Sequence, residues 1–243
     1  MGGSTGGADA QAYYVRPGEK IQNAINAAKD GDTINVASGA YLENLAIDKN
    51  LNINGADPAS TTINGNYNRD SVIKIISPCS LSNFAIMNGI QAYGNGGGIQ
   101  INLQRGTTVS LTNCIISYNS ARSGGGISIS GGNVVLSGCK IYRNTAIDGD
   151  GGGIYNGGSL TLLGGTTISG NAANRMPAAA APSRFNAVHG GGIFNFKIID
   201  GIGGTTSVGE GSSVYENTPD NIYDCNPWKI VPLDPTGPRP VLW

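Results

Sequence analysis

The chain has few charged residues and no long apolar run. Only 13% of its 243 residues are charged, about half the share usual in globular proteins, and the net charge is -1. Such a surface offers nucleic acid or an anionic membrane no concentration of positive charge. No apolar stretch approaches the roughly 18 residues that a membrane-spanning helix needs. The sequence therefore predicts no nucleic-acid partner and no membrane span.

Histidine and cysteine are scarce as well. The single histidine, His189, excludes a metal site built from several histidines. The four cysteines, Cys79, Cys114, Cys139 and Cys225, form no C-x-x-C pair, which excludes zinc-ribbon and thioredoxin-like motifs. We therefore predict neither a metal centre nor a cofactor, with calcium as the one ion left open.

Glycine, in contrast, is abundant, and it recurs in a pattern. A Gly-Gly-Gly-Ile segment occurs four times, beginning at Gly96, Gly124, Gly151 and Gly190. The start-to-start spacings are 28, 27 and 39 residues (124 minus 96, 151 minus 124, 190 minus 151). Self-similarity at such a period is typical of repeat proteins whose units stack on one another. The longer third spacing predicts an inserted loop over residues 172–189.

Asparagine recurs in step with the glycine triplets. Asn119, Asn144 and Asn171 each follow an isoleucine by three residues and a leucine by eight, and Asn217 continues this column with Val214 three residues before it. The gaps of 25 and 27 residues between the first three asparagines suit one turn of a three-sided coil.

Stacking such coils gives each column a place. The leucine and isoleucine columns, with Leu111, Leu136 and Leu163 among them, are expected to form a dry interior, because one coil alone cannot bury its apolar face. The asparagines are expected at corners, where a side-chain amide bonds the backbone or the next amide and the left-handed conformation is tolerated. The glycine triplets suit another corner that needs positive φ or close packing. The residues assigned to this structural repeat are Gly96, Gly97, Gly98, Gly124, Gly125, Gly126, Gly151, Gly152, Gly153, Gly190, Gly191, Gly192, Asn119, Asn144, Asn171 and Asn217.

Cys114 and Cys139 occupy one position of this frame, five residues before Asn119 and Asn144. On neighbouring strands their Cα atoms would lie within disulfide range, but side chains in parallel register seldom reach the required torsion. We therefore expect two buried thiols that act as small hydrophobic groups.

The amino-terminal part combines one helix with short strands. Ile21, Ala24, Ile25 and Ala28 fall on one face of a helix expected at about residues 18–29. The pattern then changes to a period of two, which predicts strands at 33–36, 45–47, 51–53 and 62–64 joined by tight corners. No helical crossover returns between these strands.

Two groups of segments give the chain a resemblance. The run from Ile21-Gln22-Asn23-Ala24-Ile25 through Asp30-Gly31-Asp32-Thr33-Ile34 to Ile63-Asn64-Gly65-Asn66 resembles the cap and first coils of right-handed parallel β-helix proteins, the pectin-lyase-like superfamily. The downstream repeats resemble its polymorphic-outer-membrane-protein and adhesin-like surface branch. Together the matches cover roughly residues 13 to 225.

The resemblance and the repeats together imply an all-β fold with a single domain, a right-handed parallel β-helix (β-solenoid) of about seven coils. We predict a flexible leader over 1–12, the β-helix with its short capping helix over 13–225, and a proline-rich tail over 226–243. The last seventeen residues contain five of the eleven prolines and both tryptophans, which favours an extended arm.

One outward column holds the candidates for catalysis. His189 directly precedes the fourth glycine triplet, and the matching positions are Asn95, Ser123 and Asp150, with Asp148 nearby. Asp148, Asp150 and His189 suit an acid/base pair or a cation site. The alternative is that they are solvated turn residues, which often precede glycine.

The resemblance also implies what an enzyme of this superfamily would carry. A lyase needs acidic calcium ligands and a basic residue, and Arg105, Arg122, Lys140 and Arg143 lie among the repeats, where some of them could share a face. The paired aspartates, Gly-His-Gly and Arg-Ile-Lys of the hydrolases and the Gln-Asp-Thr of pectin methylesterases are absent. These absences favour a non-catalytic protein.

The expected function is therefore a non-catalytic, adhesin-like or structural module, secreted or at the cell surface, whose export signal is not in this chain. It would bind a glycan or a surface protein, or assemble with copies of itself through the tail. The alternative is a polysaccharide-active enzyme, either a lyase or a glycoside hydrolase. The candidate binding residues are Arg175, Arg184 and Phe185 in the insertion and Trp228 and Trp243 in the tail.

Overall fold

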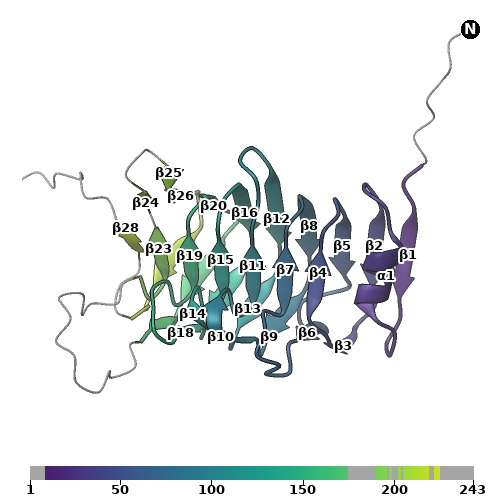
Figure 1. Ribbon diagram of the computed structural model, residues 1–243, viewed down its shortest axis with the longest axis horizontal. Coiled ribbons are helices and arrows are strands. Elements are labelled where there is room, and N and C mark those ends of the chain that lie inside the picture. The colour runs from purple at the N-terminus through teal and green to yellow at the C-terminus, as the bar shows by residue number, and fades with distance from the viewer. Residues whose placement is uncertain are drawn as a thin grey trace, which may run out of the picture.

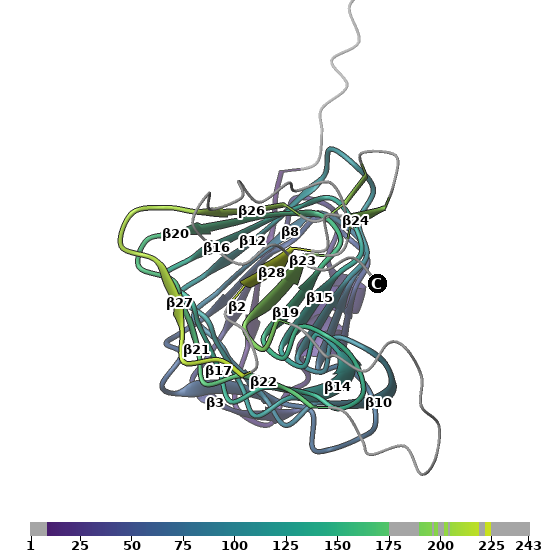
Figure 2. The ribbon, with the colours of Figure 1, turned by 90° about the vertical axis from the view of Figure 1, so that its left-hand side faces the viewer.

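The chain forms a right-handed parallel β-helix, as the sequence predicts (Figure 1). The computed structural model describes residues 9–174, 190–195, 197–198, 202–203, 205–218 and 222–224. Three parallel sheets form the sides of a stack of seven coils, and the view along the long axis shows these sides around a common interior (Figure 2). A fourth, shorter sheet adds a side that the three-sided coil of the sequence prediction does not include.

The strands of each sheet pair in parallel and in chain order. Sheet A comprises β1 (Ala12–Val15), β2 (Thr33–Val36), β5 (Asn52–Gly55), β8 (Cys79–Ser82), β12 (Thr108–Thr112), β16 (Asn133–Ser137), β20 (Ser159–Leu163) and β26 (Thr205–Val208). Sheet B comprises β3 (Gly39–Leu42), β6 (Thr61–Asn64), β9 (Ala85–Met87), β13 (Ile115–Ser117), β17 (Lys140–Tyr142), β21 (Thr167–Ser169) and β27 (Ser213–Tyr215).

Sheet C comprises β4 (Leu45–Ile47), β7 (Ile73–Ile75), β11 (Ile99–Ile101), β15 (Ile127–Ile129), β19 (Ile154–Asn156), β23 (Ile193–Asn195) and β28 (Ile222–Asp224). Sheet D, between sheets B and C, comprises β10 (Ile90–Asn95), β14 (Ser120–Ser123), β18 (Thr145–Ala146) and β22 (Ala172–Ala173). Coil 1 runs from β2 to β4, and coils 4, 5, 6 and 7 begin at β12, β16, β20 and β26. A short antiparallel pair, β24 (Lys197–Ile198) and β25 (Ile202–Gly203), lies between coils 6 and 7 in the sequence.

A short helix, α1 (Ile21–Ala27), covers the first coil, with Ile21, Ile25 and Ala28 buried. It is shorter than the predicted 18–29, because residues distant in the sequence cap both ends. The Glu43 carboxylate accepts hydrogen bonds from the backbone N–H groups of Ile21 (2.9 Å) and Gln22 (3.2 Å). At the other end the Lys49 ammonium donates to helix carbonyls, where a positive charge is favourable.

The leucine column of the interior differs from the prediction in one coil. Leu111 and Leu136 are fully buried in register, but the next member is Leu162, and Leu163 is 41% exposed. The corner after β20 holds one extra residue, the pair Gly164-Gly165 where coil 5 has Gly138 alone. Because of this extra residue, the buried leucine of this coil lies nine residues before Asn171 (171 minus 162) and not eight.

The predicted asparagine column is a buried ladder of side-chain amides. Each Nδ2 donates to the Oδ1 of the next asparagine, over 3.0 Å from Asn119 to Asn144, 3.0 Å from Asn144 to Asn171 and 2.9 Å from Asn171 to Asn217. Each amide also donates to a carbonyl of the preceding coil. The left-handed conformation lies at the residue before each asparagine, which is Tyr118, Arg143, Gly170 or Glu216, and not at the asparagine itself.

The glycine triplets have the two backbone roles that the sequence predicts. The first glycine of each triplet has positive φ, for example +63° at Gly124 and +68° at Gly151. The second lies against another coil, since a Cβ atom on Gly125 would stand 2.5 Å from backbone atoms of Thr145. Glycine is required there because nothing larger fits between two backbones.

The thiols of Cys79, Cys114 and Cys139 are free and buried, which confirms the prediction for Cys114 and Cys139. Each of these two thiols contacts a backbone carbonyl of the preceding coil, and the Thr166 hydroxyl donates to such a carbonyl at the next position of the column. Within the described ranges, no helix has the length and apolar character needed to cross a membrane.

Candidate functional site

The residues before the glycine triplets lie in one column, as far as the structure describes them. Asn95 and Ser123 are paired across β10 and β14, and the Gly124 N–H donates to the Asp150 carbonyl over 3.0 Å. The Asp150 N–H in turn donates to the Ser123 hydroxyl over 3.2 Å. His189, the fourth expected member, lies outside the described residues, so its place beside Asp150 stays a prediction.

Asp148 and Asp150 lie on the turn that joins β18 to β19, at the corner between sheets D and C. Asp148 is exposed and Asp150 is half-buried. Because only one residue separates them, their Cα atoms are no more than about 7 Å apart. Two carboxyl groups within about 5 to 9.5 Å are the usual requirement for cleavage of a glycosidic bond. The turn therefore brings two carboxylates to the same corner of coil 5.

A third aspartate on this side of the coil, Asp70, is bound to other side chains. Asp70 accepts hydrogen bonds from the Lys74 ammonium over 2.7 Å and from the Gln91 amide over 2.9 Å. It precedes β7 in coil 2, three coils from Asp150, which corresponds to a separation of about 14 Å at the usual strand spacing. Asp70 is too distant to act with Asp150 on one bond.

Beside the aspartate turn, aromatic rings stack along the outer face of sheet C. The ring centres of Tyr155 and Phe194 are 5.4 Å apart at an interplanar angle of 21°, and those of Phe194 and Tyr223 are 5.6 Å apart at 6°. The rings come from β19, β23 and β28, which pair in register. They form a continuous aromatic column over coils 5 to 7, parallel to the long axis.

The same column continues with polar side chains toward coil 2. Lys74, Gln100 and Ser128 pair in register on β7, β11 and β15. Ser128 is buried, and its hydroxyl has no hydrogen-bond partner within the part of the chain that the structure describes. The outer face of sheet C is thus an extended strip with polar groups in coils 2 to 4 and aromatic rings in coils 5 to 7.

The sequence holds a signal for this strip at the residue that follows each triplet's isoleucine. The residues before the triplets do not reveal it. Gln100, Ser128, Tyr155 and Phe194 are the residues that follow these isoleucines. A strand places consecutive side chains on opposite faces, so the buried isoleucine directs its successor outward. Conversely, Asn156 and Asn195 point inward, and a hydrogen bond of 2.8 Å joins their amides.

The basic side chains among the repeats do not converge on this strip. Lys140 and Arg143 lie on the side of sheet B, where the Arg143 guanidinium donates to the Tyr118 hydroxyl and stands 5.5 Å from its ring centre. Arg122 lies on β14, and Arg105 lies on the turn between sheets C and A. Among the described residues, no group of three His, Cys, Asp or Glu side chains is placed to hold a metal ion.

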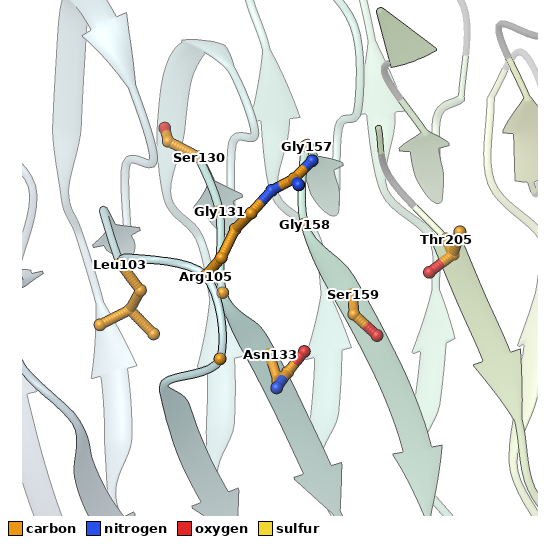
Figure 3. Close-up of a pocket in the computed structure, with 11 residues that line it drawn as sticks. Leu103, Arg105, Ser130, Gly131, Asn133, Gly157, Gly158, Ser159 and Thr205 are labelled. Atoms are coloured by element: carbon orange, nitrogen blue, oxygen red, sulfur yellow. The ribbon is translucent and has the colours of Figure 1, made fainter. Parts of the chain in front are cut away.

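A hollow of about 360 Å³ lies at the corner between sheets C and A (Figure 3). Its walls are the turns after β11, β15 and β19, with glycines such as Gly131 and Gly157, and the first residues of three strands of sheet A, which are Asn133, Ser159 and Thr205. Arg105 extends across this hollow (Figure 3). No carboxylate of the described residues lines it.

Three solved structures resemble this fold. They are two structures of a pectin methylesterase from Aspergillus niger, at 19% identity with a TM-score of 0.49 and at 16% with 0.35, and a pectin methylesterase from carrot, at 12% with 0.42. The first Aspergillus niger alignment covers 86% of this chain and 70% of that chain, and the second covers 87% and 85%. The carrot alignment covers 93% of this chain and 90% of that chain. No family model matches the sequence, and a search of curated proteins found no relative.

These findings contradict the expected function. The three similar structures are pectin methylesterases, and they contradict the expectation of a non-catalytic, adhesin-like module, which we do not retain. At such low identity the likeness concerns the fold and does not transfer a reaction. No comparison tests the closeness to surface repeat proteins.

The remaining predicted binding residues cannot be placed. Arg175, Arg184, Phe185, Trp228 and Trp243 lie outside the described residues, so both their roles and self-association through the tail stay predictions.

Proposed function

We propose that this protein is a polysaccharide-active enzyme that cleaves a glycosidic bond beside the outer face of sheet C. One observation carries the proposal: the carboxylate pair of Asp148 and Asp150 lies five to seven residues before Tyr155, where the aromatic column begins. A catalytic pair and an extended surface thus meet at one coil.

The shape of the strip favours a polymer as substrate. Its members repeat at the strand spacing of about 4.8 Å, so a linear chain laid along the axis would meet one outward side chain per coil. The Gln100 amide and the Tyr155 hydroxyl are the hydrogen-bonding groups of the strip that suit sugar hydroxyls, whereas the Ser128 hydroxyl is buried. Phe194 is buried, so the half-buried rings of Tyr155 and Tyr223 are the parts of the aromatic column that could meet the apolar C–H groups of a sugar ring.

The two aspartates would divide the work of hydrolysis. One carboxyl group would give its proton to the leaving glycosidic oxygen, while the other would take a proton from the attacking water or attack the anomeric carbon itself. We propose His189 as a third member of the site, on the basis of its position before the fourth triplet. The absent Gln-Asp-Thr segment argues against ester hydrolysis by the pectin methylesterase residues.

Two further parts of the proposal have separate tests. A polysaccharide substrate outside the cell requires a secreted or surface-attached enzyme, which fractionation of the producing cells would check. Calcium remains a proposal for an acidic substrate, and titration calorimetry with calcium alone would detect a site whether or not the protein is active.

A product assay tests the function. The protein is incubated with neutral and uronic-acid polysaccharides, with and without calcium, and the mixtures are analysed for new reducing ends, unsaturated ends and released methanol. Hydrolysis predicts reducing ends without the other two products. Unsaturated ends would indicate that the bond is cleaved by elimination and not by hydrolysis, and methanol alone would indicate an esterase. The absence of every product would overturn the proposal.

A further inference from the structure

The outer face of sheet A has an unusual composition. None of the outward positions on its eight strands is charged, although the chain contains 31 charged residues (15 Lys and Arg plus 16 Asp and Glu). Apart from Ala12, Tyr14, Val135 and Leu163, every outward side chain is serine, threonine or asparagine. Because charge is the usual means of keeping a sheet face solvated, this face is suited to contact an uncharged partner rich in hydroxyl groups.

Hydrogen bonding divides this face into two halves. In the first coils the polar side chains bind one another, over 2.7 Å from the Ser80 hydroxyl to Asn52 and over 2.8 Å from the Ser82 hydroxyl to Asn54. In coils 4 to 7 the outward side chains make no hydrogen bond with any residue that the structure describes. This second half includes Ser110, Thr112, Ser137, Thr161 and Ser207.

The hollow beside sheets C and A opens onto this second half. Asn133, Ser159 and Thr205 line the hollow and also begin the strands of the polar face, where they pair in register. Arg105 reaches over the hollow and forms no hydrogen bond or ion pair with another described residue (Figure 3). The surface therefore joins a flat row of hydroxyl and amide groups to a recess with one guanidinium donor.

We propose that this second half and the hollow together bind a neutral polysaccharide chain, at a place separate from the sheet C strip. Hydroxyl and amide groups both donate and accept, as sugar hydroxyls do, and the guanidinium adds up to five donors. A single cation at the margin does not match the repeated charge of an acidic polymer. The repeat of about 4.8 Å along the coils would meet one sugar of an extended chain after another.

Binding is measured by titration calorimetry with three neutral β-1,4-linked hexasaccharides, of glucose, mannose and xylose, and with hexagalacturonate as the charged comparison. The measurements are made on the wild type and on Asp150→Asn, so that turnover does not obscure binding. We expect at least one neutral hexasaccharide to bind both proteins equally. The proposal concerns a second site, so this result does not depend on the proposed catalytic function.

Variants then locate the site. Ser159→Ala combined with Thr161→Ala, and separately Arg105→Ala, are expected to weaken binding about tenfold, through the loss of one to three hydrogen bonds to the sugar. The matched control is Ser80→Ala combined with Ser82→Ala. It alters the same sheet face in the first coils, where the polar side chains form hydrogen bonds with one another. This control is expected to leave the dissociation constant unchanged.

Four outcomes would overturn the proposal. They are no binding of any neutral hexasaccharide, tighter binding of hexagalacturonate, equal loss in the control variant, and loss caused by Tyr155→Ala but not by the sheet A variants. The mass in solution is measured on the same samples. If the sheet A variants changed the oligomeric state and not the affinity for sugar, the face would be an interface between copies of the chain.

Discussion

The buried thiols show how the coil environment controls single residues. Burial raises the pKa of Cys79 to about 12, and the hydrogen bond with Cys139 together with burial raises the pKa of Cys114 well above its usual value. A thiol reacts as its thiolate, which these two residues rarely form.

We therefore predict that Cys79 and Cys114 resist alkylation by iodoacetamide at about pH 8, near the pKa of a free thiol, while the protein is folded. After unfolding in guanidinium they should react at the rate of a free cysteine. Peptide mapping by mass spectrometry distinguishes them from Cys225. Rapid labelling of Cys79 in the folded protein would show that the first coils open readily.

Asp32 gives a prediction about acid stability. Its buried carboxylate accepts backbone hydrogen bonds from Gln11 and Lys29, both at 2.7 Å, and these bonds lower its pKa. A lowered folded-state pKa stabilises the protein above the unfolded-state pKa, near 3.9, and this contribution disappears as the pH falls through the folded-state pKa.

We predict that Asp32→Asn lowers the melting temperature at pH 7 and that the difference from the wild type shrinks as the pH falls below about 4. Thermal unfolding at a series of pH values measures it. A difference that is independent of pH would show that Asp32 acts through its shape rather than its charge.

At the scale of structural elements, the asparagine ladder is the main device that holds one coil in register with the next. Asn144 donates to Asn171 and to the Ile116 carbonyl (2.9 Å) and accepts from Asn119. Its removal leaves several buried polar groups without partners.

We predict that Asn144→Ala lowers the free energy of unfolding by about 3 kcal/mol. The control, Asn102→Ala, alters an exposed asparagine and should change stability by less than about 0.5 kcal/mol. Urea unfolding measures both. Equal effects in the two variants would mean that the ladder contributes little to stability.

Glycine is needed at the coil corners for two different reasons, a positive φ at some positions and a lack of space for a Cβ atom at others. Gly170 has φ of +61°, and a Cβ atom added to it would meet no other atom within 4 Å. A Cβ atom on Gly125, by contrast, would stand 2.5 Å from backbone atoms of Thr145. Only the second position lacks space.

We predict that Gly170→Ala costs about 1–2 kcal/mol, the usual penalty for a left-handed residue with a Cβ atom. Gly125→Ala should cost more, because neither backbone can yield without breaking the ladder of sheets C and D. Unfolding midpoints in urea compare the two. A smaller cost for Gly125→Ala would mean that adjacent coils separate easily.

Sequence patterns predicted these elements where the repeat was regular and failed where one coil changed length. The spacing of the glycine and asparagine columns was enough to predict the corners and the stacked amides. The extra glycine before Thr166 shifted the count and made Leu163 look buried. The left-handed residue was assigned to asparagine because asparagine tolerates that conformation best, yet the ladder requires the asparagine side chain to point inward and moves the left-handed turn to Tyr118 and Arg143.

At the scale of the whole molecule, the period predicted a solenoid of seven coils, but the function required knowing which columns face outward. The carboxylate pair could be found from the residue before each triplet. Without register, only part of the aromatic column could be recognised, because Tyr155 and Phe194 each follow a triplet's isoleucine but Tyr223 follows no triplet. The polar face of sheet A was hidden for the same reason.

The proposal that this fold cleaves a polysaccharide at the Asp148–Asp150 turn is tested most directly by the turnover of Asp150→Asn. On the substrate found in the product assay, we predict that kcat falls about 10²- to 10⁴-fold, the usual contribution of a general acid or base, while the melting temperature is kept. The control is Asp48→Asn, an exposed aspartate in coil 1, which should keep full activity. Unchanged turnover in a folded Asp150→Asn protein would contradict the account.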